Sequence, residues 1–435
     1  MKGGRELKRY GQLVSNPSCL TDETVEKTTY GVIKKEGKWF CVQCETTQNH
    51  YFCQYQSAFF TDPVTYCRHC ITMGRMDSVH KVTLTKTEHQ CSEGNYELSF
   101  VLSPQQQYAS TRIVNALHEK ESLLLHAVTG AGKTEMMFEA ISVARKKGYN
   151  VAVVSPRVDV VVEVSQRICK TFKNENIDVL HQASQQKFNG HFIIATVHQL
   201  YRFKNHFDVI FIDEVDAFPL SMDPNLMQCI SSAARNEKTL IYMTATPPKR
   251  LLSAFSQENI ITLPARFHRF PLVVPTFKYL RVKFRRQQRY LIKHLKKQVQ
   301  AQRTTLLFFS NIEEMKCFYE TYQPLFDALC FVYSEDPERL SKVQALRDGR
   351  YKVVLTTTIL ERGFTMPYLD VWVMDSHKHT ASALIQIAGR VGRKAICPDG
   401  TVQFYHIGRT LAMYTARHEI KHMNKLGREK GWIQH

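Results

Sequence analysis

Nine short apolar runs lie between residues 122 and 408 and are separated by longer amphipathic segments. They are SLLLHAV, NVAVVSP, HFIIATV, DVIFIDE and TLIYMTAT, followed by TTLLFFS, KVVLTTT, DVWVMDS and TVQFYHIG. Runs of this length predict strands, and the segments between them are long enough for helices. Strands that alternate with helices form parallel sheets with helices on both faces. The pattern therefore predicts an α/β fold.

Nine predicted strands are more than a typical single sheet holds, and a proline-containing segment divides them into two groups. This segment, LPARFHRFPLVVP at 263–275, carries three prolines and is typical of a linker. We therefore expect one lobe over residues 96–265 and a second over residues 266–435. Residues 1–95 have clustered cysteines and many aromatic residues but no strand–helix alternation, which indicates a separate small region.

The composition bears on the compartment in which the chain works. Hydrophobic residues make up 43% and charged residues 23% of the 435 positions, as in soluble globular proteins. No stretch approaches the roughly 18 consecutive apolar residues of a membrane span. The N-terminus, MKGGRELKRYG, lacks the apolar core of a secretion signal. We expect a cytoplasmic protein with reduced cysteines.

Positive charge is concentrated in the C-terminal part of the chain. The formal net charge is +18, and residues 266–435 hold 29 Lys and Arg residues against 14 Asp and Glu residues. Nine basic residues and no acidic one lie between residues 281 and 303, namely Arg281, Lys283, Arg285, Arg286, Arg289, Lys293, Lys296, Lys297 and Arg303. This excess predicts a polyanionic partner, although Leu291 and Leu295 at helical spacing also fit an ordinary solvated helix face. An anionic membrane would attract the same residues, so peripheral membrane association stays open.

The segment LLLHAVTGAGKTEMMFEAI has the pattern of a phosphate-binding loop. An apolar strand is followed by a turn of small residues, then by Lys133 and Thr134, and then by an amphipathic segment. Backbone N–H groups of such a turn, and the start of the helix after it, bind phosphates. We expect Lys133 to reach the β- and γ-phosphates of ATP and Thr134 to ligate Mg²⁺. The turn residues predicted to contact the nucleotide are Thr129, Gly130, Ala131 and Gly132.

A second apolar strand, within DVIFIDEVDAF, ends in two carboxylates, Asp213 and Glu214. Acidic pairs at strand ends are commonly solvated turns. Here the pair follows the phosphate loop by about 80 residues, at the same edge of the predicted sheet, which favours catalysis. We expect Asp213 to hold Mg²⁺ through water and Glu214 to polarise the attacking water.

The segment QIAGRVGRK places Arg390 and Arg393 three residues apart and also contains Gln386. On one helix face, the two guanidinium groups could reach the γ-phosphate from a second lobe and stabilise its charge during transfer. A basic helix face is the alternative for an isolated arginine pair. It does not account for Gly389 and Gly392, which allow close backbone approach.

Four cysteines form two Cys-x₂-Cys pairs separated by 22 residues, Cys41 with Cys44 and Cys67 with Cys70. This spacing predicts a zinc module at about 38–75, because four such cysteines in the cytosol bind metal more often than they form disulfides. Cys19, Cys53 and Cys91 have no paired neighbour, and His50 and His69 are second-choice ligands. Aromatic residues between the pairs are expected mainly to pack, while one or two could stack on bases.

In combination, these motifs resemble those of superfamily 2 helicases and translocases. The segments QQQY, TGAGKT, VVSPRVDV, ATVHQL, DEVD, TATPP, LLFFS, TTTILERGFT and QIAGRVGR follow one another in the family's order over residues 105–393. The resemblance implies two RecA-like lobes of the P-loop NTPase type, with ATP hydrolysis and nucleic-acid binding. DEVD differs from the DEAD and DEAH spellings of many RNA helicases, which loosens assignment to that group.

Several residue roles are implied by this resemblance, position by position. Gln106 matches the glutamine that reads adenine, with Gln105 as the alternative. Arg362 and Gly363 match the second-lobe motif that couples ATP to nucleic acid, and Gln386 is assigned to the nucleotide site with them. Segments that grip the nucleic-acid backbone are matched by Ser155, Pro156, Arg157 and Thr196 in the first lobe and by Thr356 to Thr358 in the second. The motif TATP, which belongs to the same series, contains Thr244 and Thr246.

A four-cysteine module ahead of two such lobes, in a basic chain with a DEVD tetrad, resembles the ComFA family. These are late-competence ATPases of Gram-positive bacteria, and the resemblance covers nearly the whole chain. It implies ATP, Mg²⁺ and Zn²⁺ as cofactors, and ATP hydrolysis stimulated by single-stranded DNA. It also implies a place at the cytoplasmic face of the membrane and partners in the competence machinery, including ComFC and the DNA-uptake channel. Oligomeric state stays open.

Two other interpretations stay open. One is a general DNA repair or restart helicase or an RNA helicase, since such motors mostly hold the phosphate backbone, which DNA and RNA share. The other is a zinc nucleic-acid-binding protein with a relic ATP site. The chain retains all the residues that we expect to act in hydrolysis, which argues against a relic ATP site. These are Lys133, Asp213, Glu214, Arg390 and Arg393.

Overall fold

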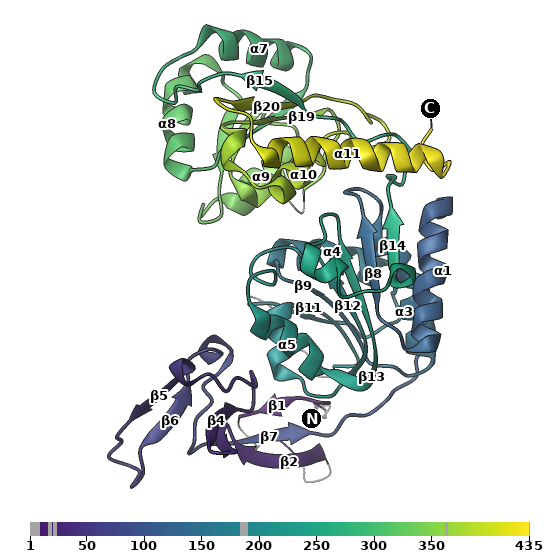
Figure 1. Ribbon diagram of the computed structural model, residues 1–435, viewed down its shortest axis with the longest axis vertical. Coiled ribbons are helices and arrows are strands. Elements are labelled where there is room, and N and C mark those ends of the chain that lie inside the picture. The colour runs from purple at the N-terminus through teal and green to yellow at the C-terminus, as the bar shows by residue number, and fades with distance from the viewer. Residues whose placement is uncertain (1–8, 16–19, 21–23, 183–189, 362–363, 435) are drawn as a thin grey trace, which may run out of the picture. The chain divides into compact units, whose positions relative to one another are not determined.

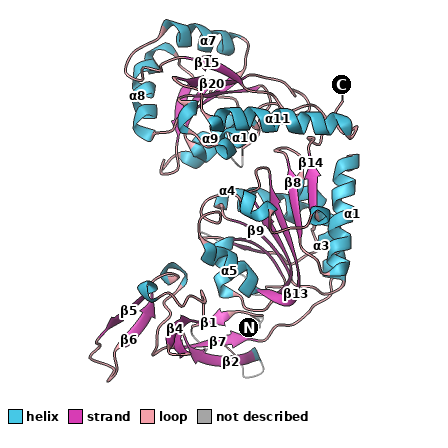
Figure 2. Ribbon diagram, viewed as in Figure 1, coloured by secondary structure: helices cyan, strands magenta, loops and turns pink. Residues whose placement is uncertain are grey.

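The computed structural model describes residues 9–15, 20, 24–182, 190–361 and 364–434. It contains two large sheets with helices on either side, together with a small N-terminal region built of short strands (Figures 1 and 2). The predicted α/β fold with two parallel-sheet lobes is confirmed. All nine apolar runs named above are strands.

The N-terminal region is built from antiparallel strands. A three-stranded sheet has the order β1 (Leu13–Val14), β7 (Lys81–Thr85) and β2 (Val25–Tyr30). Two hairpins follow, β3 (Val32–Lys35) with β4 (Lys38–Cys41) and β5 (Phe52–Tyr55) with β6 (Val64–Cys67). Two 3₁₀ turns, η3 (Asn49–Tyr51) and η4 (Ile71–Met73), precede and follow the second hairpin.

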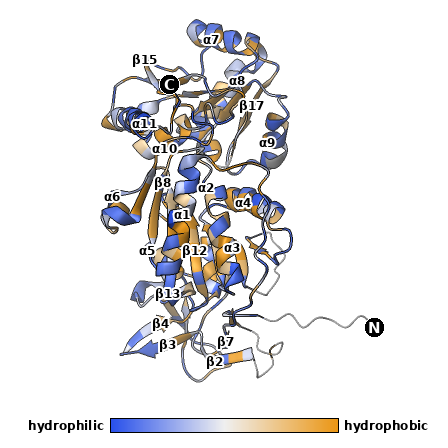
Figure 3. Ribbon diagram, turned by 90° about the vertical axis from the view of Figure 1, so that its right-hand side faces the viewer, coloured by the Kyte–Doolittle hydropathy of each residue, from blue (hydrophilic) through white to orange (hydrophobic). Residues whose placement is uncertain are grey.

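The first large sheet has seven strands. Their order is β10 (Asp178–Leu180), β11 (Phe192–Thr196), β9 (Val151–Ser155), β12 (Phe207–Asp213), β13 (Ala234–Thr244), β8 (Leu123–Ala127) and β14 (Ile260–Leu263). The neighbours from β10 to β13 are parallel. Every residue of β9 and β11 is buried, as expected for parallel strands covered on both faces. In Figure 3 the hydrophobic colour gathers on strands of this sheet around the labels β8 and β12.

The helices that accompany this sheet are α1 (Pro104–Glu119), α2 (Lys133–Met136), α3 (Phe138–Lys146), α4 (Val158–Thr171), α5 (Pro224–Ala233) and α6 (Lys249–Leu252), with the 3₁₀ turns η5 (Val197–Arg202) and η6 (Gln257–Asn259). The start of α5 shows how the sequence sets a helix end. The Asp223 side chain accepts a hydrogen bond from the Asn225 N–H, and Pro224 occupies the first turn, where a missing N–H costs nothing.

The second large sheet has six strands, all parallel to their neighbours. Their order is β15 (Thr276–Tyr279), β20 (Val402–His406), β19 (Leu369–Val373), β16 (Thr304–Phe308), β18 (Val353–Thr356) and β17 (Leu329–Val332). Its helices are α7 (Arg289–Gln300), α8 (Ile312–Tyr322), α9 (Arg339–Arg347), α10 (Ala381–Ala388) and α11 (Leu411–Glu429), with the 3₁₀ turns η7 (Gln323–Leu325), η8 (Thr358–Glu361) and η9 (Ser376–Lys378). Among the helices in the described ranges, none is both long and apolar enough to cross a membrane.

The chain divides into two compact units. The first comprises residues 1–101, 107–125 and 134–261. The second comprises residues 102–106, 126–133 and 262–435. The phosphate-loop residues up to Lys133 thus group with the C-terminal sheet, while the strand-end carboxylates group with the seven-stranded sheet.

Candidate nucleotide site and metal centre

Four parallel strands of the first unit end in residues singled out from the sequence. β9 ends at Ser155, β11 at Thr196, β12 at Asp213 and β13 at Thr244. Ser155 and Thr196 are paired in register, as are Asp213 and Met243, which precedes Thr244. The carboxyl ends of parallel strands form the usual ligand-binding edge of an α/β sheet. The sheet therefore brings these polar residues to one edge.

The acidic tetrad is tied to the threonines that follow β13. Asp216 accepts hydrogen bonds from the hydroxyls of Thr244 at 2.6 Å and Thr246 at 2.5 Å. Glu214 has a left-handed backbone with φ of 53°, and its N–H donates to Asp213 Oδ1 at 2.9 Å. A left-handed conformation is uncommon for a residue with a side chain and occurs often at functional sites. The sequence did not identify Asp216 as the residue that joins the two motifs.

The phosphate loop connects β8 to α2. Gly130 and Gly132 have φ of 84° and 78°, a conformation that glycine adopts without steric cost. The turn is closed by a hydrogen bond from the Ala131 N–H to the Val128 carbonyl at 3.1 Å. The predicted single helix after the loop is two short helices, since α2 ends at Met136 and α3 begins at Phe138. Lys133 is the first residue of α2.

The two candidate adenine-reading glutamines have different partners. Gln105 uses both ends of its amide on the backbone of Ala265, donating to its carbonyl and accepting from its N–H. Gln106 accepts from the Ser103 N–H at 2.9 Å, at the start of α1. Gln105 is thereby committed to holding residue 265, which leaves Gln106 as the better candidate for the base.

The arginine segment follows α10 and is not part of it. The helix ends at Ala388, and Gly392 has a left-handed φ of 69°, so Arg390 and Arg393 lie in a turn and the predicted shared helix face is wrong. The buried Arg390 guanidinium donates to the carbonyls of Glu361 and Phe364, and the half-buried Arg393 donates from Nε to the Gly389 carbonyl at 2.9 Å.

Within the second unit, the arginine segment contacts the phosphate loop. The Thr129 hydroxyl donates to the Gly389 carbonyl at 3.3 Å. A Cβ added at Gly389 would lie 2.0 Å from Thr129 Oγ1, so only glycine fits at this contact. Gln386, near the end of α10, is buried.

The motif predicted to couple ATP to nucleic acid is only partly visible. Arg362 and Gly363 lie outside the described residues. Thr356 ends β18, and Arg390 holds the carbonyls on both sides of the pair, those of Glu361 and Phe364. The structure thus connects this motif to the arginine segment through Arg390.

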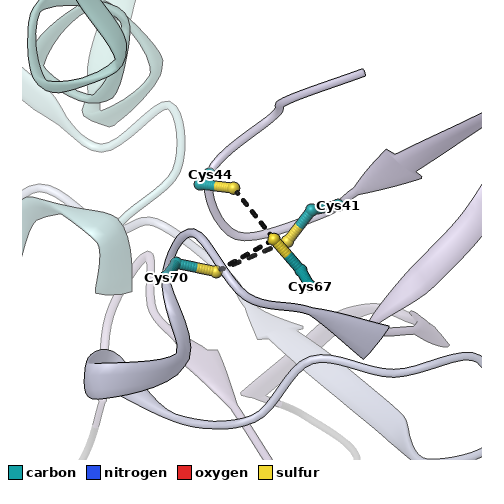
Figure 4. A group of neighbouring side chains, drawn as sticks. All are labelled: Cys41, Cys44, Cys67 and Cys70. Carbon is teal, nitrogen blue, oxygen red and sulfur yellow. Dashed lines mark hydrogen bonds between the residues drawn. The ribbon is translucent and has the colours of Figure 1, made fainter. Parts of the chain in front are cut away.

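The four paired cysteines meet in one buried cluster (Figure 4). Their ligand atoms all lie within 4.8 Å of one another, and Sγ–Sγ distances are 3.6 Å for Cys41–Cys70, 3.6 Å for Cys44–Cys67 and 3.9 Å for Cys67–Cys70. A disulfide requires about 2.05 Å. Four sulfurs around tetrahedral zinc, each about 2.3 Å from the metal, would be about 3.8 Å apart. The donor set and its spacing therefore fit Zn²⁺.

The histidines near the cysteines have other surroundings. His69 Nε2 lies 3.6 Å from Asp223 Oδ2, and its ring packs edge-on against Tyr51. His50 is exposed beside Tyr51, with ring centroids 4.0 Å apart. In the part of the chain that the structure describes, the metal-type cluster consists of the four cysteines alone.

Within the first unit, the cysteine module packs against elements of the seven-stranded sheet region through both polar and apolar contacts. Glu45 forms an ion pair with Lys204 at 2.8 Å and also accepts from Ser232 and Gln228. Burial would raise the pKa of Glu45, but these partners outweigh it and hold the pKa below its ordinary value. The four cysteines belong to one buried apolar cluster with residues of η5, β12 and α5, including Leu200, Tyr201 and Ile230.

The basic stretch of the second unit has a packed side and an exposed side. Leu291 and Leu295 of α7 are buried, whereas the basic residues from Arg281 to Lys297 are exposed. Arg303 is different, because its Nε lies 2.5 Å from the buried Asp370. The helix packs on one face and presents cations on the other, and Arg303 is a structural residue.

We expect purified protein to contain about one Zn²⁺ per chain, lost when Cys41 and Cys44 are both changed to Ser. Since structural zinc sites bind with about 10 kcal/mol or more, residues 30–95 should lose their fold first. Metal analysis and thermal melting measure this, with Cys53→Ser as the matched control. A metal-free protein that melts like the wild type would contradict the prediction.

Three family models match the chain. Residues 15–84 match the competence protein ComFA N-terminal domain, residues 99–249 the res subunit of type III restriction enzymes, and residues 286–395 the helicase conserved C-terminal domain. Two curated relatives are similar over most of their length. Competence protein ComFA of Bacillus subtilis is 37% identical, covering 89% of this chain and 86% of the relative. That of Streptococcus pneumoniae is 34% identical, covering 90% and 92%.

Solved helicase structures share the fold. Mss116p bound to single-stranded RNA and AMP-PNP aligns with a TM-score of 0.56 at 16% identity, covering 70% of this chain and 69% of that one. RecG bound to a three-way DNA junction aligns with a TM-score of 0.52 at 17% identity, covering 76% and 47%. At such identities the likeness concerns the arrangement of strands and helices alone.

Proposed function

The chain belongs to the competence protein ComFA family and is an ATP-hydrolysing helicase of superfamily 2, and we propose that it uses ATP to move single-stranded DNA into the cell during natural competence. The observation that carries the proposal is that the similarity extends over 89% of the chain and includes the N-terminal domain, so it is not confined to the motor segments that many helicases share.

We assign nucleotide binding to the phosphate loop and to the residues that match the family's motifs. In this proposal Lys133 and the backbone of Thr129, Gly130, Ala131 and Gly132 bind the phosphates of ATP, as the left-handed glycines of the loop support. Gln106 reads the adenine. Gln386 and Gly363 complete the nucleotide contacts.

Hydrolysis is assigned to carboxylates and arginines. Thr134 and Asp213 would hold Mg²⁺, which when bound neutralises charge on the transferring phosphate. Glu214 accepts a proton from the attacking water, and its backbone N–H donates to the Asp213 carboxylate and helps to hold it in place. Arg393 stabilises the developing phosphate charge. Arg390 is assigned with it, and its hydrogen bonds to Glu361 and Phe364 also position the coupling motif.

Single-stranded DNA is assigned to backbone-gripping segments in both sheets. Ser155 and Thr196 lie side by side at adjacent strand ends, with Arg157 just beyond the end of β9. Thr356 ends β18 of the six-stranded sheet. The exposed cations of α7 add positive charge that attracts phosphates over longer distances.

The N-terminal module is proposed to bind one Zn²⁺ through Cys41, Cys44, Cys67 and Cys70. Beyond the motor itself, we propose ComFC and the DNA-uptake channel as partners, at the cytoplasmic face of the membrane. The support for these partners is family membership.

The test of the function is the ATPase rate with different nucleic acids. We expect single-stranded DNA to stimulate hydrolysis at least tenfold more than duplex DNA or RNA of the same length. Equal stimulation by RNA would favour an RNA helicase, and a preference for forked duplex DNA would favour a repair or restart helicase. Heat-denatured genomic DNA and poly(dT) serve as sequence controls.

A further inference from the structure

Arg266 is a buried cation that sequence analysis did not single out. It lies in the segment between β14 and β15 and is 1% exposed. Its Nη1 donates to the Gly392 carbonyl at 2.5 Å and its Nη2 to the Gly389 carbonyl at 3.3 Å. Its Nε–H is buried without a hydrogen-bond partner among the described residues. All these groups belong to the second unit.

Within the described ranges, no carboxylate forms an ion pair with Arg266. Burial, together with the like charge of Arg393, lowers the pKa of Arg266 to about 9. Buried charges in proteins are normally paired, because an uncompensated one is costly. The structure therefore holds a buried guanidinium that has no anionic partner among the described residues.

The two carbonyls that Arg266 contacts do not depend on it. The Gly392 carbonyl lies 3.0 Å from His268 Nε2, which would donate to it. The Gly389 carbonyl also accepts from Thr129 and from Arg393. If the guanidinium moved away, both carbonyl oxygens would still have a hydrogen-bond donor, so no buried acceptor would be left unsatisfied.

The stem of Arg266 lies against the phosphate loop. A Cβ added at Gly130 would be 3.5 Å from Arg266 Cγ and 3.7 Å from its Nε, so the unpaired N–H is beside the turn. The next residue, Phe267, donates its backbone N–H to the Gly130 carbonyl at 3.1 Å. The loop and the arginine are thus fixed to each other through the main chain.

We propose that Arg266 is a phosphate-binding residue of the nucleotide site, whose guanidinium exchanges the carbonyls of Gly389 and Gly392 for phosphate oxygens of ATP. The inference rests on the proposed phosphate loop. Guanidinium and phosphate form charge-assisted, often bidentate hydrogen bonds, which are stronger than bonds to neutral carbonyls. Because the carbonyls it releases precede Arg390 and Arg393, phosphate binding at Arg266 also removes two of the hydrogen bonds made to the segment that carries those arginines.

The test is Arg266→Met, which removes the charge and keeps most of the stem. We expect affinity for AMP-PNP, measured by calorimetry, to fall at least tenfold, and the rise in melting temperature with AMP-PNP to be largely lost. Without nucleotide, the variant should melt at or above the wild-type temperature, because an unpaired buried charge has been removed. Arg266→Lys, which retains charge but has no planar fork, should recover part of the affinity.

Arg269→Met is the matched control, since Arg269 lies in the same segment and donates to the Gly431 carbonyl at 3.0 Å. It should keep the wild-type response to AMP-PNP. Wild-type affinity for AMP-PNP in Arg266→Met would overturn the inference. A nucleotide-free melting temperature well below that of the wild type would also overturn it, because it would show that Arg266 serves to stabilise the fold. Lys133→Ala in the same assay separates the two proposals. If it too binds AMP-PNP normally, the phosphate loop itself is misassigned.

Discussion

Lys133→Ala is expected to reduce ATP turnover by roughly 10³-fold or more, to background, while leaving affinity for single-stranded DNA largely unchanged. The reason is that Lys133 follows the left-handed Gly132 at the end of the phosphate loop, where its ammonium would neutralise the β- and γ-phosphates. No assigned DNA contact involves this residue. The effect should therefore separate the nucleotide site from the DNA site.

ATPase rate and equilibrium binding of a fluorescent oligonucleotide, measured on the same preparation, test this expectation. Lys170→Ala, an exposed lysine on α4, is the matched control. Glu214→Gln supplies a second comparison, because it should retain bound ATP and lose only hydrolysis. Turnover at the wild-type rate in Lys133→Ala would show that the loop does not bind the nucleotide.

Arg393→Ala is expected to remove most hydrolysis, by roughly 10³-fold, while preserving ATP binding, and to stop single-stranded DNA from stimulating the residual rate. Arg393 is half-buried, and its Nε donates to the Gly389 carbonyl, in the segment that we assign to the γ-phosphate. If ATP and DNA bias one conformational equilibrium, the coupling is reciprocal, and a residue that completes the ATP site also carries the response to DNA.

The decisive measurement is ATPase rate against single-stranded DNA concentration for wild type, Arg393→Ala and the exposed neighbour Lys394→Ala as control. A mutant that keeps the full fold-stimulation would mean that Arg393 does not couple the two activities. Arg390 is a poorer probe, because its guanidinium is buried on the carbonyls of Glu361 and Phe364, and its loss would disturb the backbone as well.

Strand positions could be predicted where strands are central in their sheets. The nine apolar runs became strands because residues buried on both faces are apolar without interruption. The strands that the pattern did not reveal in the two large sheets are β10, β14, β15 and β17, which occupy the four sheet edges. Each has only three or four residues, and the exposed TFKY of β15 carries no apolar run.

Candidate residues at strand ends could be placed from sequence because parallel strands deliver their carboxyl ends to one edge. Features that depend on the tertiary fold could not be predicted from the sequence. Helical spacing suggested that Arg390 and Arg393 share a helix, but the left-handed Gly392 places them in a turn. Arg303 counted as a surface cation, yet it pairs with the buried Asp370, 67 positions away. Arg266 is one arginine among many until its burial is known.

The way the cysteine module is seated limits what can be learned by trimming the chain. Its sulfurs share an apolar cluster with Tyr201 and Ile230, and Glu45 neutralises Lys204. A shortened protein beginning near residue 96 would expose that cluster to water and leave Lys204 without its counter-charge. Such a protein would tend to aggregate, so its inactivity would say nothing about DNA. Point substitutions outside these contacts, for example at the exposed Phe59, are the informative way to test what the module does.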